Sequence, residues 1–218
     1  MEFWALLGIV LGILVIVGLV SFWLEKRRTE AMRQVASGLN LSFKPSDKDK
    51  EVRAKYSAFR LFDKGHSRKV FNIMEGKADD MSIRMFDYEY VIGRGGRRST
   101  VWQQTIIHFT SEKLQAPLFY MRPEGLMERI GTTVMGTQDI DFDSNSQFSL
   151  AYQLQSAYER EVREFFNDKR LNFFAENKSW FIETRNHEVI IYQEGYRSST
   201  NDTPLYFKQA MNVFNMLV

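Results

Sequence analysis

The residues whose types and spacing could best support chemistry are three aspartates at alternate positions: Asp139, Asp141 and Asp143. In an extended strand alternate side chains share a face, so these carboxylates would point one way and Ile140 and Phe142 the other. Carboxylate oxygens bind Ca²⁺ or Mg²⁺. An EF-hand loop would continue with glycine and glutamate where Ser144 and Leu150 stand. We therefore expect a solvated strand edge, with a metal-dependent hydrolase as a less favoured alternative.

A second cluster is basic and lies in the segment Gly93–Arg98. It places three arginines among glycines: Arg94, Arg97 and Arg98. Glycine lets backbone N–H groups approach an anion, and the guanidinium groups add charge. Acidic lipid headgroups are the ligand that this chemistry favours near a membrane. The order G-R-G-G-R-R matches neither the dinucleotide fingerprint nor the P-loop, and a hairpin tip is the plainer interpretation.

Other catalytic chemistry is sparsely represented in the sequence. His66, His108 and His187 form no H-x-x-x-H pair, and no G-x-S-x-G elbow occurs. The chain has no cysteine, which excludes disulfides, thiolate zinc sites, iron–sulfur ligation and cysteine nucleophiles. Its 29 basic and 27 acidic residues give a net charge of +2 and no reason to expect nucleic-acid binding. We expect a protein that is not an enzyme, with no cofactor and no nucleic-acid partner.

The element that positions everything else is an apolar run at the N-terminus. Phe3–Leu24 contains 22 residues without a charge, and as a helix it spans about 33 Å, enough for a hydrocarbon core of about 30 Å. Trp4 and Trp23 stand at its two ends, where indole rings favour the membrane interface. A signal peptide would start with basic residues and end at a small-residue cleavage site, whereas Glu25–Arg28 follows this run. We predict a transmembrane anchor over residues 1–28.

The charges beside this run predict its orientation. Lys26, Arg27 and Arg28 follow it, and no lysine or arginine precedes it. Because positive charge is retained on the cytoplasmic side, the N-terminus should lie outside a bacterial inner membrane and the rest of the chain in the cytoplasm. The two tryptophans and these three basic residues are the predicted membrane-interface anchors.

Three glycines within the run offer a surface for helix packing: Gly8, Gly12 and Gly18. Gly8 and Gly12 form a small-xxx-small pair, which lets a second helix approach closely. Glycine is also simply common in membrane helices. If a partner helix exists, from another transmembrane protein or a second copy of this chain, this is the face that we expect it to use.

The rest of the chain reads as an α+β domain built on an antiparallel sheet. Residues 29–50 are expected to form a juxtamembrane helix, Thr29–Asn40, and a linker, and residues 51–218 a cytoplasmic domain. The expected strands are Leu39–Phe43, Val70–Met74, Ser82–Ile92, Thr100–Phe109, Leu118–Met121, Phe148–Leu154, Trp180–Glu183 and Val189–Tyr192. The expected helices are Glu51–Phe62, one opened by a capping box at Ser156–Glu159, and one after Thr203-Pro204.

Side-chain patterns add detail to this outline. Within Ser82–Ile92, aromatic residues share one face, and Asp87 and Glu89 lie on the other. The last helix carries an apolar stripe made of Phe207, Ala210, Met211, Phe214 and Leu217. The pairs Glu159–Arg163 and Arg160–Glu164 are spaced as ion pairs on one helix face.

Two short stretches carry a resemblance to a known group of proteins. They are Met85–Tyr90 and Asp139–Ser144, the second followed closely by Phe148-Ser149 and Tyr152. With these residues the chain resembles uncharacterised bacterial proteins that have one N-terminal membrane helix and a soluble α+β domain. The resemblance covers most of residues 30–218. It implies this architecture, and it implies no catalytic residue.

The function that these observations favour is not enzymatic. A glycine-bearing membrane helix and a nearly neutral, well-structured domain are expected of a scaffold or accessory subunit that braces or caps a larger membrane protein complex. The alternative is a binding module at the cytoplasmic face that senses anionic lipid or a small ligand.

Overall fold

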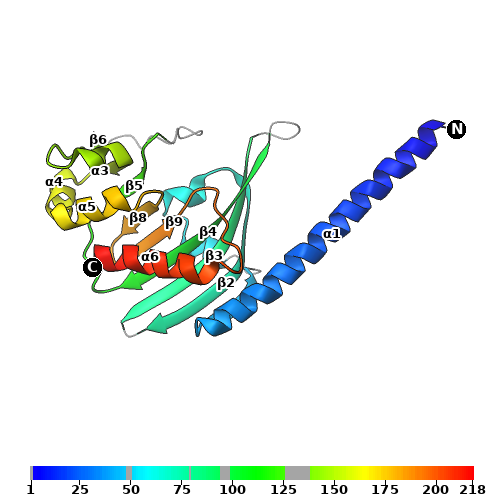
Figure 1. Ribbon diagram of the computed structural model, residues 1–218, viewed down its shortest axis with the longest axis horizontal. Coiled ribbons are helices and arrows are strands. Elements are labelled where there is room, and N and C mark those ends of the chain that lie inside the picture. Colours follow the sequence, from blue (N-terminus) through cyan, green and yellow to red (C-terminus); the bar gives the residue numbers. More distant parts are fainter. Residues whose placement is uncertain (1, 48–50, 79, 94–98, 126–137) are drawn as a thin grey trace.

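The computed structural model describes residues 2–47, 51–78, 80–93, 99–125 and 138–218. The chain folds into a long N-terminal helix and a domain built on one antiparallel sheet (Figure 1). This is the predicted α+β class. The N-terminal part of the helix projects away from the domain, and its other end lies beside the sheet (Figure 1).

Helix α1 runs from Glu2 to Gly38 without a break. It joins the apolar run and the predicted juxtamembrane helix into one rod of about 55 Å. It is long and apolar enough to cross a membrane, and no residue of its most apolar window is buried. The helix ends where Asn40 takes a left-handed conformation (φ 56°) and the Leu41 N–H donates to the carbonyl of Ala36 at 2.8 Å.

Within the described residues the sheet has nine strands in the order β1-β2-β3-β4-β9-β8-β5-β7-β6, each antiparallel to its neighbours. They are β1 Ser42–Ser46, β2 His66–Ala78, β3 Met81–Ile92, β4 Thr100–Ser111, β5 Tyr120–Pro123, β6 Gln138–Asp139, β7 Tyr152–Ser156, β8 Phe181–Arg185 and β9 Glu188–Tyr192. The β3–β4 and β8–β9 hairpins confirm the sequence prediction. The β3–β4 pairing is unbroken from Met81↔Ser111 to Ile92↔Thr100.

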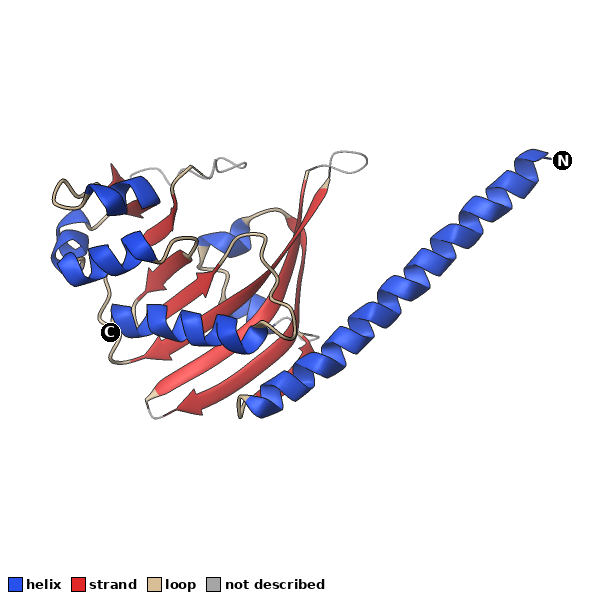
Figure 2. Ribbon diagram, in the orientation of Figure 1, coloured by secondary structure: helices blue, strands red, loops and turns tan. Residues whose placement is uncertain are grey.

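In the described part of the chain, six further helical segments pack around the sheet (Figure 2). They are α2 Glu51–Lys55, the 3₁₀ turn η1 Arg60–Asp63, α3 Ser146–Ala151, α4 Glu159–Phe165, α5 Asp168–Glu176 and α6 Thr203–Leu217. The predicted helix over 51–62 is therefore two short pieces, α2 and η1.

The sheet is covered on both faces. One face contributes Met85, Ile107 and Ile191 to a core that also contains Met32 and Ala36 of α1 and the apolar side of α6. The other face is aromatic. Its core residues include Tyr56, Phe62, Phe86, Tyr88 and Tyr90. Helix α1 is thus anchored in the first core by two fully buried side chains, Met32 and Ala36.

Two strand predictions need correction. The segment Phe148–Leu154 is helix α3 followed by strand β7, because the Asn145 side chain accepts the N–H of Phe148 and starts a helical turn. Phe148 and Ala151, three residues apart, are both buried. Leu39, Asn40 and Leu41 form the turn that follows α1, and β1 begins only at Ser42.

Two helix starts also differ from the prediction. Ser156 ends β7 instead of capping a helix, and α4 follows Tyr158. Thr203 is the first residue of α6, after Asp202, with Pro204 in the first turn as expected. The predicted ion pairs are confirmed at 2.7 Å for Arg163–Glu159 and 3.8 Å for Arg160–Glu164.

Candidate functional site

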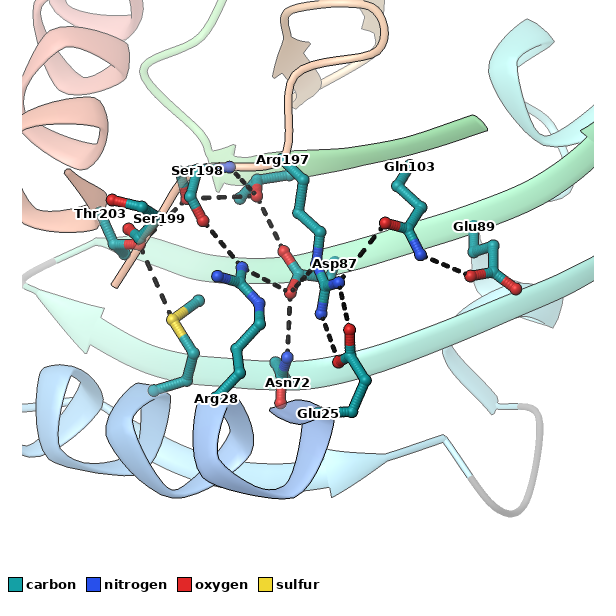
Figure 3. A network of polar contacts seen from close by, with 12 residues as sticks. Glu25, Arg28, Asn72, Asp87, Glu89, Gln103, Arg197, Ser198, Ser199 and Thr203 are labelled. Atoms are coloured by element: carbon teal, nitrogen blue, oxygen red, sulfur yellow. Dashed lines mark hydrogen bonds and ion pairs between the residues drawn. The ribbon is translucent and has the colours of Figure 1, made fainter. Parts of the chain in front are cut away.

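The most concentrated polar chemistry that the structure describes lies where α1 meets the sheet. Its centre is Asp87 of β3, which is fully buried on the face opposite Phe86 and Tyr88. Both carboxylate oxygens accept hydrogen bonds (Figure 3). The donors are Thr105 Oγ1 at 2.8 Å to Oδ1, and Asn72 Nδ2 at 2.9 Å, Arg28 Nη2 at 3.0 Å and Arg197 Nε at 3.1 Å to Oδ2.

Arg28 brings α1 into this centre. The same Nη2 that contacts Asp87 donates to the backbone carbonyl of Ser198 at 2.7 Å. One guanidinium therefore ties the helix both to strand β3 and to the loop between β9 and α6. Only 17% of the Arg28 side chain is exposed.

Arg197 makes the second link between helix and domain. Its Nη1 and Nη2 donate to the two carboxylate oxygens of Glu25 at 2.7 and 2.8 Å, a bidentate arrangement, while its Nε donates to Asp87. Glu25 lies one turn before Arg28 on the same side of α1. Burial works against the charged form, but the hydrogen bonds and charges of Glu25 and Asp87 raise the pKa of Arg197, which remains cationic.

A β-bulge delivers Asn72 to this centre. The register of β2 against β3 shifts between Phe71 and Met74, and Asn72 takes a left-handed conformation (φ 53°) that asparagine tolerates. The bulge places the Asn72 amide beside Asp87 while Ile73 and Met74 pack into opposite cores.

The network continues into the start of α6. Ser198 donates its N–H to Thr105 Oγ1 at 3.0 Å, and its hydroxyl lies 3.0 Å from that of Thr203. Thr203 in turn lies 3.7 Å from the sulfur of Met32 (Figure 3). We call the residues Glu25, Arg28, Asn72, Asp87, Thr105, Arg197, Ser198 and Thr203 the α1 junction.

The α1 junction balances two carboxylates, Glu25 and Asp87, against two guanidinium groups, Arg28 and Arg197. Every one of these charges has an opposite charge within 3.1 Å. Arg28, Asp87 and Arg197 are largely buried, whereas Glu25 is 52% exposed. Removing a partner of the buried groups leaves an uncompensated charge, so these groups resist separation. The arrangement suits mechanical coupling of helix and domain.

The predicted membrane-interface residues divide into two groups. Trp4 and Trp23 are exposed, and the Arg27 guanidinium lies 4.0 Å from the centre of the Trp23 ring. Arg28, predicted to lie at the membrane surface, instead turns into the domain because the buried charge of Asp87 attracts it. The glycines predicted for helix packing, Gly8, Gly12 and Gly18, have no described atom within 4 Å of an added Cβ.

The acidic candidate is only partly a strand. β6 ends at Asp139, and Asp141 and Asp143 follow outside it, all three exposed, with Ile140 and Phe142 buried as predicted. Asp139 accepts hydrogen bonds from Gln153 Nε2 at 3.0 Å and the Leu154 N–H at 3.2 Å. Among the described residues no group of three histidine or acidic side chains could hold a metal ion. The predicted anion-contact residues Arg94, Arg97 and Arg98 lie outside the described ranges.

Sequence reasoning missed the α1 junction because Asp87 alternates with aromatic residues as a solvent-facing strand residue does. One signal was available. Asp87 lies within a twelve-residue strand, and Met85, on the same face of that strand, is apolar. An apolar neighbour indicates that this face is buried, and a buried carboxylate needs a cationic partner. Nothing in the sequence says that the partners are Arg28 and Arg197, which stand 59 and 110 residues away.

The fold and junction together define an α+β protein whose N-terminal helix, long and apolar enough to cross a membrane, is locked onto an antiparallel sheet. A solved structure of similar fold is the mycobacterial trehalose monomycolate transport factor A, TtfA. It aligns with a TM-score of 0.61 and 9% sequence identity, over 87% of this chain and 94% of that one. Comparison with family models and with curated proteins gives no match. At this identity the likeness concerns the fold alone.

Proposed function

We propose that this protein is a membrane-anchored, non-enzymatic accessory subunit that holds its domain rigidly beside a larger membrane protein complex. The observation that carries the proposal is the α1 junction. A flexible tether would need no buried charges, whereas here Arg28 and Glu25 fix the helix to β3 and to the loop before α6. Rigid attachment matters when a domain must meet a partner in one orientation.

The exposed part of α1 supports the proposal. The large apolar side chains described between Phe3 and Leu24 are exposed, so this surface of the helix is open to lipid or to another helix. Gly8 and Gly12 share one side of it, where a partner backbone can approach closely.

The flanking charges give the proposed placement. Lys26 and Arg27 follow the apolar run, so we place the N-terminus outside an inner membrane and the domain in the cytoplasm. The partner is another transmembrane protein or a second copy of this chain.

Extraction of the intact chain in a mild detergent tests the proposal. We expect the protein to elute in a complex larger than its own micelle, with a constant set of membrane proteins or a second copy. A chain that runs alone, under conditions that keep other membrane complexes intact, contradicts the subunit role.

Two substitutions test the face that we propose for packing. Gly8→Leu with Gly12→Leu adds bulk where the partner helix would approach, and should release the partner. Val10→Phe is the matched control, because at 100° per residue Val10 points away from both glycines. If Val10→Phe releases the partner equally, the glycine face is not the contact.

A further inference from the structure

A polar hollow lies on the aromatic face of the sheet, next to α2, and the proposed accessory role makes no use of it. It has a volume of about 300 Å³ and is lined by Lys55 of α2 and by residues near the ends of β2, β3 and β4, among them Lys77, Arg84 and His108. A second hollow of about 500 Å³ shares Lys55, Glu75 and Arg84 with it. We call the first hollow the α2 groove.

The side chains that line the α2 groove carry an excess of positive charge. Lys55, Lys77 and Arg84 are basic, and Glu75 is the acidic residue among its described lining residues. Glu75 is already engaged, because its carboxylate is ion-paired with Arg84 and lies 3.6 Å from Lys44 Nζ. Lys55 Nζ lies 3.6 Å from the carboxylate of Glu188, which is not among the lining residues. The lining residues themselves carry more positive than negative charge, and this excess favours an anionic ligand.

His108 adds a directed hydrogen-bond donor. The ring is 2% exposed, and its Nδ1 lies 3.0 Å from the hydroxyl oxygen of Tyr56. Arg84 Nη1 donates to that same oxygen at 3.2 Å. The Tyr56 proton is therefore free to point at Nδ1, which makes Nδ1 the acceptor and leaves the hydrogen of the neutral ring on Nε2.

The neutral ring is the stable form in this position. Burial, with the charges of Lys55 and Arg84, lowers the pKa of His108 to about 3. Glu188 faces the ring from β9, yet its carboxylate is 3.7 Å from Nε2, beyond hydrogen-bond distance. Within the part of the chain that the structure describes, Nε2 has no hydrogen-bond partner.

A buried N–H without an acceptor costs free energy, so an acceptor is expected beside it. Lys55, Arg84 and His108 all line the α2 groove. An oxygen acceptor that also carries negative charge would satisfy the ring and the cations together.

We propose that the α2 groove binds a small anion through a phosphate or carboxylate group, which accepts from His108 Nε2 and is held by the charges of Lys55, Lys77 and Arg84. This proposal does not rest on the accessory role, and either can fail without the other.

The anion could come from solution or from a lipid headgroup, and the distance of the groove from the membrane distinguishes these two sources. Residues 25–38 of α1 carry the helix about 21 Å beyond the end of the apolar run. Ser42, which follows α1 and pairs with Glu75, lines the groove. This distance favours an anion from solution over a lipid headgroup.

The test uses the full chain in a neutral detergent, labelled with ¹⁵N-histidine. The chain has 3 histidines, so His66 and His187 serve as internal controls for His108. Inorganic phosphate is added at constant ionic strength. We expect a saturable shift of the His108 ring signals, with a Kd of the order of millimolar, and small shifts of the other two. Equal, unsaturated shifts of all three rings overturn the proposal.

Three lysine substitutions and a competition with lipid complete the test. Lys55→Gln and Lys77→Gln should each raise the Kd by roughly threefold to tenfold. Lys69→Gln, at an exposed lysine of β2 that pairs with Glu89, should leave it unchanged. A Lys69→Gln effect as large as that of Lys55→Gln overturns the proposal, because binding would then follow overall charge. Phosphatidylglycerol added to the detergent micelles should not displace phosphate, and a His108 shift caused by phosphatidylglycerol alone overturns the assignment to a dissolved anion.

Discussion

At the residue scale, the single carboxylate of Asp87 is the buried counter-charge of two guanidinium groups. Arg28 and Arg197 both contact its Oδ2, and their side chains are 17% and 12% exposed. Asp87→Asn keeps the shape of the side chain and removes the charge, which leaves two guanidinium groups without their buried counter-charge. We expect the free energy of unfolding to fall by about 3 kcal/mol, measured by denaturant titration of the full chain in detergent micelles.

Asp80→Asn is the matched control for this substitution. Asp80 is 41% exposed and lies 3.3 Å from Lys113 Nζ in a surface pair. Such pairs contribute little, so the same chemical change should cost less than about 1 kcal/mol. Equal costs for the two variants would show that the buried charges of the α1 junction do not stabilise the domain.

Glu183 is one residue whose shifted pKa makes stability depend on pH. Its buried carboxylate accepts the N–H groups of Arg60 and Leu61, and burial outweighs these bonds and raises its pKa from 4.5 to about 7. The folded state therefore holds a proton that the unfolded chain releases at lower pH. The stabilisation is complete below about pH 4.5 and is lost as the pH rises through 7, a change of about 3 kcal/mol.

Glu183→Gln checks this dependence, because glutamine does not titrate. The unfolding free energy of the variant relative to the parent should rise by about 2.5 kcal/mol between pH 5 and pH 8. Glu159→Gln, at an exposed residue that pairs with Arg163 on α4, should keep the parental pH profile. A parental profile in Glu183→Gln would show that another group is responsible.

The sequence predicted on which face of a strand a side chain lies better than it predicted which residues that side chain contacts. The alternation in Ser82–Ile92 correctly predicted that Asp87 and the aromatic residues lie on opposite faces. The alternation in Asp139–Asp143 correctly predicted that Ile140 and Phe142 are buried. An alternating pattern shows only to which face of the strand each side chain points. Whether a polar face meets water or a buried cation depends on segments far away in the chain, here α1 and the loop before α6.

At the element scale, long elements with a strong local signal were predictable. Helix α1, the β3–β4 and β8–β9 hairpins and the apolar stripe of α6 follow from hydropathy and turn residues. Short elements were not. Six residues of α3 carry too little periodicity to separate helix from strand, and a single side-chain cap from Asn145 decides between them.

The turn between η1 and β2 shows how one residue positions an element. Gly65 has a φ of +59°, and an added Cβ would overlap the carbonyl oxygen of Val91. Gly125 has a φ of +77° with no described atom within 4 Å of its Cβ position. Alanine is strained at both positions, but only at Gly65 must the backbone of β3 also move. We expect Gly65→Ala to lower the unfolding free energy by about 2 kcal/mol more than Gly125→Ala.

Denaturant unfolding of the two alanine variants measures this difference. It also tests η1, because Gly65 links η1 to the sheet, and Phe62 of η1 lies in the aromatic core together with Tyr56 and Phe59. Equal costs would mean that β2 and β3 adjust without loss, and that the turn does not fix the position of η1.

At the scale of the whole molecule, α1 and the domain behave as one body in this structure. Met32 and Ala36 lie in the core, Glu25 and Arg28 bond to the domain, and the rest of α1 extends outward (Figure 1). A partner bound to the apolar run would thereby set the orientation of the sheet. The absence of cysteine makes this measurable, since introduced cysteines would be the only labelling sites.

Spin labels at Ser21→Cys on α1 and Lys113→Cys beyond β4 measure the coupling by pulsed electron resonance in lipid nanodiscs. We expect one narrow distance distribution, because the α1 junction holds the helix at a fixed angle. Glu25→Gln with Arg28→Gln removes both links from the helix side and should broaden the distribution, because the contacts of Met32 and Ala36 alone allow the rod to tilt. Arg33→Gln removes an exposed pair with Glu30 on the same helix and should leave the width unchanged. A parental distribution that is already broad would show that the helix swings freely, and the junction would then stabilise the domain without orienting it.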